Sequence, residues 1–585
     1  MERVVKSLTG GLNLLVHPTQ LNEDQLQVLE NMEVRPTNVG DNITYLALTS
    51  RFSYKRLNAS DLGLTPANLI EFVQRNSGVG ITTFTGAGLN DGTFSGTYTG
   101  STVLSTYEVE IDSSVASPDT FKWRKDAGSY TTNVSITAGV AQTLAEGVKI
   151  TFAAGDGHTL GNKWIVNVSP SGTKWLVTGG WDGSANFVVK ALRDGQTSPI
   201  TVKSQASSNT AICSFMIFNN QLYYTNGALA WRKWNGLDDV ASTYTTITKY
   251  AIQHKNKAIY LNDVTNNIPN QIWVSNTGTP ETVSASNGFL IGDYSDAIVL
   301  GIDQRERIVI GKEKSMWLFA LAPTITDSTL LKGEQFKGTI SPLGSMYASA
   351  GTFIYGDRTG MQTLSGLYME PVVLQLINQL RGFNNSKAAL SFKDEQLLIS
   401  TLSDSGQTRN NRIYLIDLID ETQKVWQYNL SIGCFCQNIG SLTFGKRLKA
   451  MEDDGTNRYF IELDEVSSPQ ETNISCVAQT KDWMDLDKER IPRVQKVKHI
   501  IVDFIAPNTS NALTLKIYGD GSLKETLPFT PSSTGFNRHM FKPRLDLSRG
   551  YRISYRFEYT QPGSDATRFS ILNYSDEIIV ETRVE

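Results

Sequence analysis

The sequence predicts an all-β fold: a β-propeller with a small β-sandwich inserted into it and a β-sandwich or jelly-roll domain at the C-terminus. From about residue 200, short runs rich in Ile, Val, Tyr, Phe and Trp alternate with polar or glycine turns. The 47 glycines and 22 tyrosines fit many strands joined by tight turns. Clear helical periodicity is confined to two short segments, so strands should build nearly all of the structure.

The first element is expected to be a short helix that begins after Asn22. Asn22 stands at the N-cap position, and Gln25 follows it as a capping-box partner. The next apolar residues recur every third position and would form one stripe: Leu26, Leu29 and Met32. In the predicted division of the chain this helix belongs to residues 1–80, an N-terminal clasp with the first propeller strands.

Residues 81–169 interrupt the propeller pattern and are expected to form an inserted β-sandwich. Their first part has the Gly/Ser/Thr bias of a loop-rich β module. Apolar and aromatic residues with period two predict its core: Tyr107, Val109, Ile111, Phe121, Trp123, Ile150, Phe152, Trp164 and Val166. The propeller pattern resumes at "TKWLVTGGWDG" (173–183), which makes this module an insertion.

Residues 170–470 are expected to hold the remainder of the propeller. "AIVLGIDQRERIVIGKEKSMWLFA" (297–320) reads as strands turning at "GKEK", with Ile308, Ile310, Met316 and Leu318 on one apolar face. A series of β-sandwiches would give similar hairpins. The propeller is preferred because radial repetition leaves a long antiparallel chain few exposed edges. Residues 370–383 are the second helix candidate.

Residues 471–585 are expected to form the C-terminal sandwich. "KVKHIIVDFIA" (496–506) and "YRISYRFEYT" (551–560) are long strands whose apolar and polar residues alternate.

Composition limits the classes of function. A net charge of −4 and a pI near 5.9 argue against a protein that coats nucleic acid. Four cysteines are too few for a disulfide framework. Neither a membrane-spanning apolar stretch nor the apolar core of a signal peptide can be found, so a protein synthesised in the cytoplasm without a membrane span is expected.

Sequence motifs predict no catalytic residue, no cofactor site and no metal site, and the chain is not expected to be an enzyme. The five histidines are spread along the chain, and the common phosphate-loop and serine-nucleophile motifs are missing. Cys434 and Cys436 are expected to be buried thiols. Acidic loops at 155–161 and 452–458 could hold calcium, but Asp-Gly turns explain them better, and the basic run 488–499 fits a solvated strand face. Paired carboxylates for glycoside cleavage stay open, because the fold decides which carboxylates meet.

Several segments, in order along the chain, resemble tail hub and nozzle proteins of tailed bacteriophages. They are "TGGLNLLVHPTQLNEDQLQVLENMEV" (9–34), "LYYTNGALAWRKWNG" (222–236), "IVIGKEKSMWLF" (308–319), "GTISPLGSMYASAGTFIYGDRTGMQTLSG" (338–366), "IYLIDLIDETQKVWQYNL" (413–430) and "TKDWMDL" (480–486). The inserted module is similar to small β modules of phage tail and fibre proteins. The resemblance carries no catalytic residues.

This resemblance implies a structural virion protein: a β-propeller subunit, made in the host cytoplasm, of a homo-oligomeric ring, possibly a hexamer, around the DNA exit channel. It implies contacts with other tail proteins such as the adaptor and fibres, and passage of DNA without specific binding. Two alternatives stay open: a tail fibre or receptor-binding adhesin, and a propeller glycosidase or lyase acting on host polysaccharide. As a further hypothesis, residues 9–34 clasp the propeller ring beside its last blade.

Overall fold

The computed structural model describes most of the chain. The described residues are 6–8, 10, 12–13, 17–22, 24–38, 44–51, 53–75, 78–115, 117–207, 212–333, 338–348, 351–356, 360–365, 368–371, 386–393, 396–402, 407–418, 424–437, 448–465, 471, 473–484, 492–563 and 568–580.

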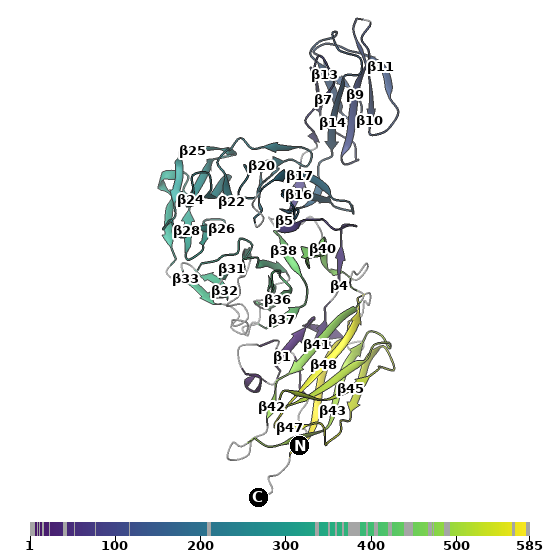
Figure 1. The fold of residues 1–585 in the computed structure, drawn as a ribbon, viewed down its shortest axis with the longest axis vertical. Coiled ribbons are helices and arrows are strands. Elements are labelled where there is room, and N and C mark those ends of the chain that lie inside the picture. The colour runs from purple at the N-terminus through teal and green to yellow at the C-terminus, as the bar shows by residue number, and fades with distance from the viewer. Residues whose placement is uncertain are drawn as a thin grey trace. The chain divides into compact units, whose positions relative to one another are not determined.

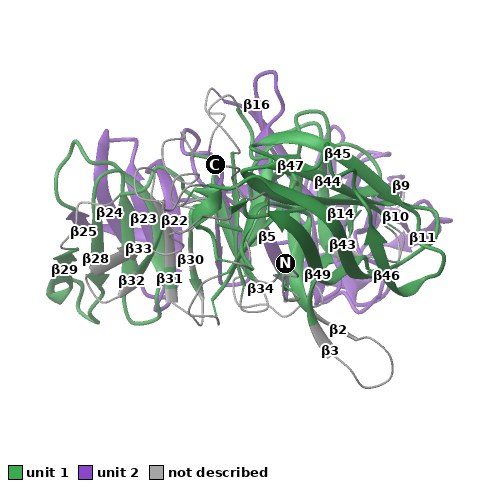
Figure 2. Cartoon of the chain, turned by 90° about the horizontal axis from the view of Figure 1, so that it is seen from below, with its two compact units in different colours: residues 1–69, 291–437, 446–585 green, residues 70–290, 438–445 purple. Residues whose placement is uncertain are grey.

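The chain divides into two compact units, coloured separately in Figure 2. Unit 1 comprises residues 1–69, 291–437 and 446–585, and unit 2 comprises residues 70–290 and 438–445. The described residues contain two short 3-10 helices, η1 (Pro18–Gln20) and η2 (Ile325–Asp327), and otherwise strands and loops. The predicted all-β fold is therefore confirmed.

Four-stranded antiparallel sheets of consecutive strands are the blades of the propeller (Figure 1). One blade of unit 1 contains β26 (Ile298–Asp303), β27 (Ile308–Lys312), β28 (Met316–Ala320) and β29 (Thr329–Lys332). The next contains β30 (Ser345–Ala348), β31 (Gly351–Gly356), β32 (Gly360–Ser365) and β33 (Tyr368–Pro371). A further sheet joins β38 (Ile432–Gln437), β39 (Lys449–Asp453) and β40 (Arg458–Glu465) to β4 (Ser53–Arg56) from the N-terminal part of the chain.

Two larger sheets of unit 1 share one hydrophobic core. The first runs β34 (Ala389–Lys393), β35 (Gln396–Thr401), β36 (Arg412–Asp417), β37 (Val425–Tyr428), β2 (Met32–Asn38), β3 (Thr44–Ser50), β49 (Ser570–Val580), β43 (Gln495–Ala506) and β46 (Gly535–Phe541), with β47 (Arg549–Gly550) paired to β43. The second runs β1 (Leu26–Glu30), β41 (Asn473–Thr480), β48 (Arg552–Pro562), β44 (Leu513–Gly519) and β45 (Ser522–Phe529), with β42 (Trp483–Met484) paired to β48. The strands after residue 470 form the C-terminal sandwich, and alternate residues of β44 are buried as expected.

Unit 2 holds further blade sheets. One contains β15 (Thr173–Trp181), β16 (Asn186–Arg193), β17 (Ile200–Ala206) and β5 (Thr65–Gln74), of which residues 70–74 belong to unit 2. The next contains β18 (Ser214–Phe218), β19 (Gln221–Thr225), β20 (Arg232–Trp234) and β21 (Asp239–Ala241). The third contains β22 (Thr248–His254), β23 (Lys257–Asp263), β24 (Ile268–Asn276) and β25 (Thr279–Leu290).

The inserted module, also in unit 2, is a sandwich of two sheets that follows β5 and precedes β15. One sheet contains β6 (Gly78–Val79), β7 (Thr83–Thr85), β9 (Ser105–Ser113), β10 (Thr120–Lys125), β11 (Thr131–Ser135) and β14 (Lys163–Ser169), and the other β8 (Gly92–Gly96), β12 (Gln142–Thr143) and β13 (Val148–Phe152). Every predicted core residue is buried except Trp123, which packs against the cluster half-buried. The limits predicted for the four regions of the chain stay predictions.

The N-terminal helix prediction is wrong, because residues 26–38 form the strands β1 and β2. The three-residue spacing has a different cause. The register of β1 shifts between Leu26 and Val28, which is a β-bulge, and Asn31 turns the chain with a φ of 56°. Each irregularity adds one residue to the period of two, so that Leu26, Leu29 and Met32 are all buried. Gln25 Oε1 does accept the Asn22 backbone N–H at 3.1 Å, although no helix follows.

The structure also bears on the second helix candidate and on the hairpin at residues 308–320. The second helix candidate, 370–383, begins in β33, and the rest of it lies outside the described residues. The β27–β28 hairpin turns where expected, but Val309 pairs with Leu318 and Gly311 with Met316. Val309 therefore shares a face with Met316 and Leu318, and Ile308 and Ile310 are buried on the opposite face.

Candidate functional site

In unit 1 the N-terminal strands connect a blade to the C-terminal sandwich, and we call this connection the N-terminal junction. No local sequence pattern indicates it. Strand β2 pairs with the blade strand β37 through Met32 and Gln427, and with β3 along its whole length. Strand β3 pairs with β49 of the sandwich through Leu48 and Ile571. One hydrogen-bonded sheet therefore passes from the blade, through the N-terminal hairpin, into the sandwich.

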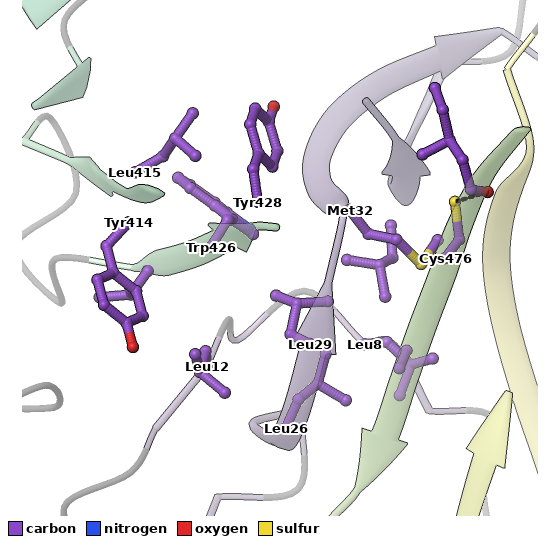
Figure 3. Packing of buried hydrophobic residues seen from close by; sticks show 14 of the residues in the cluster. Leu8, Leu12, Leu26, Leu29, Met32, Tyr414, Leu415, Trp426, Tyr428 and Cys476 are labelled. Carbon is purple, nitrogen blue, oxygen red and sulfur yellow. Dashed lines mark hydrogen bonds between the residues drawn. The ribbon is translucent and has the colours of Figure 1, made fainter. Parts of the chain in front are cut away.

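Strand β1 ties the same segment to the second sheet of the sandwich. It runs antiparallel to β41, with Leu29 opposite Ala478. Figure 3 shows Leu26 and Leu29 on β1 between the aromatic residues of the blade, among them Trp426, and Cys476 of β41. Burying a leucine side chain stabilises the fold by about 2 kcal/mol, so this apolar contact stabilises the junction substantially.

Asn31, between β1 and β2, is the polar centre of the junction. Its Oδ1 accepts hydrogen bonds from Arg51 Nε at 3.0 Å and from the Asn429 backbone N–H at 2.9 Å. Its Nδ2 donates to the Ser475 carbonyl at 2.8 Å, and its backbone N–H donates to the Gln427 carbonyl at 2.8 Å. Asparagine tolerates the left-handed conformation found here better than most residues. One side chain thus connects β37, β41 and the end of β3.

Arg51 supplies the charge of the junction and is 2% exposed. Its guanidinium donates two parallel hydrogen bonds to the Glu471 carboxylate, at 2.6 and 2.7 Å. Burial alone lowers the pKa of Arg51, and the Glu471 carboxylate outweighs this effect, so that the pKa is raised above its ordinary value. Such bidentate pairs hold both partners in one geometry, which fixes residue 471 against the N-terminal hairpin.

The clasp hypothesis needs a correction in detail. The N-terminal strand that completes a sheet of late blade strands is β4, which pairs with β40. Its Arg56 binds Glu452 bidentately at 2.7 and 2.8 Å, and Tyr54 donates to the same carboxylate at 2.8 Å. The segment before β4 instead joins the blade of β34 to β37 with the C-terminal sandwich.

The five histidines have different surroundings. His158 is buried in the inserted module, where its ring nitrogens lie 3.0 Å from Asp119 Oδ2 and 2.9 Å from Asp91 Oδ1. His499 lies 3.1 Å from Glu577, and burial lowers the pKa of His539, which stacks on a phenylalanine. His17 accepts the backbone N–H of Thr19 at η1, and His254 is buried at the end of β22. Among the described residues, no group of three or more His, Cys, Asp or Glu side chains could hold a metal ion.

The remaining sequence candidates have structural explanations. Cys434 and Cys436 are buried in β38, and burial raises the pKa of Cys434. In the loop 452–458, the Asp454 carboxylate accepts the backbone N–H groups of Thr456 and Asn457, which is the Asp-Gly turn expected. The described part of the run 488–499 includes Lys498, which pairs with Glu577 at 2.9 Å.

Two clusters were missed by the sequence reasoning. In the first, Arg51 binds both Asn31 and Glu471; in the second, His158 contacts Asp91 and Asp119. The partners in the first cluster lie about 420 positions apart in the chain. No local motif could have indicated them. His158 stands in a loop that the sequence analysis considered only for calcium, and its carboxylate partners precede it by 39 and 67 positions.

No family model and no curated protein matches the chain. Solved structures similar to it include PorZ, a surface component of the type-IX secretion system of Porphyromonas gingivalis, with 11% identity and a TM-score of 0.29 over 61% of this chain and 44% of that one. A putative 6-phosphogluconolactonase from Bacteroides uniformis matches with 10% identity and a TM-score of 0.31, over 49% and 94%. An exo-β-1,3-galactanase from Phanerochaete chrysosporium matches with 7% identity and a TM-score of 0.20, over 62% and 95%. The chain thus spans less than half the length of PorZ.

These similar structures contradict the prediction that the chain is not an enzyme, because the galactanase and the putative lactonase are among them. That prediction is withdrawn. Identities and TM-scores this low transfer no activity and no site to this chain. No helix within the described ranges is long and apolar enough to cross a membrane.

Proposed function

We propose that the chain is a structural component of a bacteriophage tail, a hub or nozzle subunit that forms part of the DNA exit channel and contacts neighbouring tail proteins. The ordered set of segments that resemble such proteins carries the proposal. The N-terminal junction supports it, because a part through which DNA is ejected must transmit load between its domains without separating.

In this function the junction acts mechanically. A force applied to the sandwich passes to the blade through the backbone hydrogen bonds of β49, β3, β2 and β37. The pair of the buried Arg51 with the partly exposed Glu471 resists separation of the segments it joins. The net charge of −4 gives passing DNA no general electrostatic attraction to the subunit.

The experiment that tests the proposal is the mass of the purified assembly by light scattering, with negative-stain images of the same sample. We expect a ring of about six copies with a central hole, since head-to-tail contacts whose rotation closes generate rings. A trimer would favour the fibre or adhesin alternative. Depolymerisation of host capsule or cell-wall glycan by the same sample would replace the structural proposal with the glycosidase or lyase alternative.

A further inference from the structure

Three loops of the inserted module meet at the end of its sandwich that lies away from the connections to β5 and β15. They are residues 86–91, between β7 and β8, residues 114–119, between β9 and β10, and residues 153–162, between β13 and β14 (Figure 1). Strand β14 begins directly after the third loop and ends at Ser169, which pairs with Gly78 beside the first connection. The loops and the connections therefore lie at opposite ends of β14.

One side chain from each loop forms a cluster that we name the loop latch: His158, Asp91 and Asp119. The His158 ring nitrogens lie 3.0 Å from Asp119 Oδ2 and 2.9 Å from Asp91 Oδ1. The three side chains are at most 8% exposed. Asp91 Oδ2 also accepts the Ala154 backbone N–H at 2.7 Å, and Asp119 Oδ2 accepts the His158 backbone N–H at 3.0 Å. The latch thus binds the first two loops to the third.

The geometry of the loop latch fixes how many protons it holds. Both ring nitrogens of His158 face a carboxylate oxygen at hydrogen-bond distance, and each of these contacts needs one proton between its two heavy atoms. A neutral imidazole between two ionised carboxylates would leave a nitrogen lone pair against an oxygen lone pair, and a buried contact without a hydrogen bond is costly. Imidazole is more basic than a carboxylate, so the two protons belong on His158, which is then an imidazolium.

The surroundings leave His158 as the cation of the latch. Among the described residues, no other basic side chain contacts either carboxylate. The three loops contain no lysine or arginine, and their one further charged residue is Asp156, whose Oδ2 accepts the Ser117 hydroxyl at 3.0 Å. The strands beneath supply uncharged rings, because Phe152 and Trp164 meet the imidazole edge-on at centroid distances of 5.3 and 5.9 Å.

The charge of the latch makes closure of the loops depend on pH. If the loops separate, His158 enters water, where a histidine loses its second proton at about pH 6.5. Above that pH the closed state therefore binds one proton more than the open state, and opening releases this proton to the solvent. By linkage, the ratio of open to closed loops rises by up to about tenfold for each unit of pH, until the closed latch also loses its proton.

We propose that the loop latch is a pH-sensitive switch, which holds the three loops together at neutral pH and releases them reversibly at alkaline pH. The two sheets of the module stay folded when the loops separate, because the core between them consists of apolar side chains that do not belong to the latch. The inference concerns the inserted module alone, and it does not depend on the assignment to a phage tail.

The test uses amide hydrogen exchange of the unmodified full chain, resolved to single residues, from about pH 6 to about pH 9. Each rate is divided by the intrinsic exchange rate at the same pH, which gives the opening equilibrium of that amide. The reporting amides are those of Ala154 and Asp119, whose hydrogen bonds join the loops. The control amides are those of Thr99 and Asp126, which are hydrogen-bonded at the opposite end of the module. In parallel, nitrogen NMR of protein with 15N-labelled histidine rings reports the protonation of His158.

We expect the opening equilibrium of the loop amides to rise at least about tenfold between about pH 7 and pH 9, while that of the control amides stays constant. Both ring nitrogens of His158 should carry a proton at neutral pH, in a signal that is identified by its loss in His158→Gln. This variant should also remove the pH dependence of the loop amides, because glutamine does not titrate, and His254→Gln, at another buried histidine of unit 2, should leave it unchanged.

Two results on the unmodified chain would overturn the proposal, so that neither depends on the folding of a variant. The first is a neutral His158 imidazole at pH 7, and the second is an opening equilibrium of the loop amides that follows the control amides over the whole pH range. A failed ring assembly would refute the tail proposal and leave these measurements unaffected.

Discussion

Replacement of Arg51 by methionine should weaken the N-terminal junction more than any other single loss of charge that we consider. Methionine retains much of the side-chain volume but leaves the Glu471 carboxylate without its two donors and Asn31 Oδ1 without one. Breaking a buried ion pair by removing one partner costs about 3 to 5 kcal/mol. Glu471 is 20% exposed, so water can compensate part of the loss, and we expect about 3 kcal/mol.

The assay is urea unfolding of the full chain, followed by tryptophan fluorescence and by far-UV circular dichroism. The control is Lys498→Met, because Lys498 is 51% exposed in its 2.9 Å pair with Glu577 and exposed pairs contribute about 0 to 1 kcal/mol. Arg51→Met should shift the transition that includes unit 1 to lower urea, and Lys498→Met should leave it nearly unchanged. Equal small effects of both variants would refute the reasoning that Arg51 holds the junction together.

Three further outcomes follow from the same contacts. Asn31→Gly keeps the φ of 56° accessible but removes three side-chain hydrogen bonds, so we expect the free energy of unfolding to fall by about 2 to 3 kcal/mol in the same urea assay. A decrease below about 0.5 kcal/mol would show that these hydrogen bonds do not stabilise the junction. Leu29→Ala should cost about 2 to 5 kcal/mol and expose β1 to limited proteolysis, and an unchanged cleavage pattern would argue against its packing function. In the inserted module, burial raises the pKa of Glu108, but hydrogen bonds from Tyr130, Lys163 and Arg124 outweigh it and hold the pKa at about 2. Because this pKa lies below the unfolded value of 4.5, the stabilisation is complete above about pH 4.5 and is lost as pH falls toward 2. The variant Glu108→Gln should lose about 2 kcal/mol of unfolding free energy at neutral pH, after allowance for screening by solvent, and its stability should fall less steeply at acid pH. A pH-stability curve parallel to that of the unmodified protein would contradict this.

The sequence was sufficient for the elements whose apolar pattern is local. The core of the inserted module follows from alternation, because each strand there buries one face of a small sandwich, and the one residue left half-buried, Trp123, stacks on Tyr107 at its edge. The same alternation predicts the strands of the C-terminal sandwich, where Leu513, Leu515 and Ile517 are buried in β44.

The N-terminal segment could not be predicted in this way, because its spacing is produced by irregular strand geometry. A β-bulge and a left-handed residue convert a period of two into three, which imitates a helix. The partners of the segment, Glu471 and Ser475 among them, follow it by more than 400 positions. Pairing over such a separation is a property of the folded topology, and a local pattern carries no information about it. The same reason applies to the expectation that the chain is not an enzyme, which was based on missing local motifs.

The measurement that tests the central structural claim most directly is native-state hydrogen exchange of unit 1, resolved to individual amides of β37, β2, β3 and β49. If one continuous sheet joins the blade to the sandwich, these amides should open with the same free energy, and Arg51→Met should lower that free energy for all four strands together. If the amides of β37 and of β49 open with separate free energies, and Arg51→Met changes neither or only one of them, the blade and the sandwich are independent and the junction does not couple them.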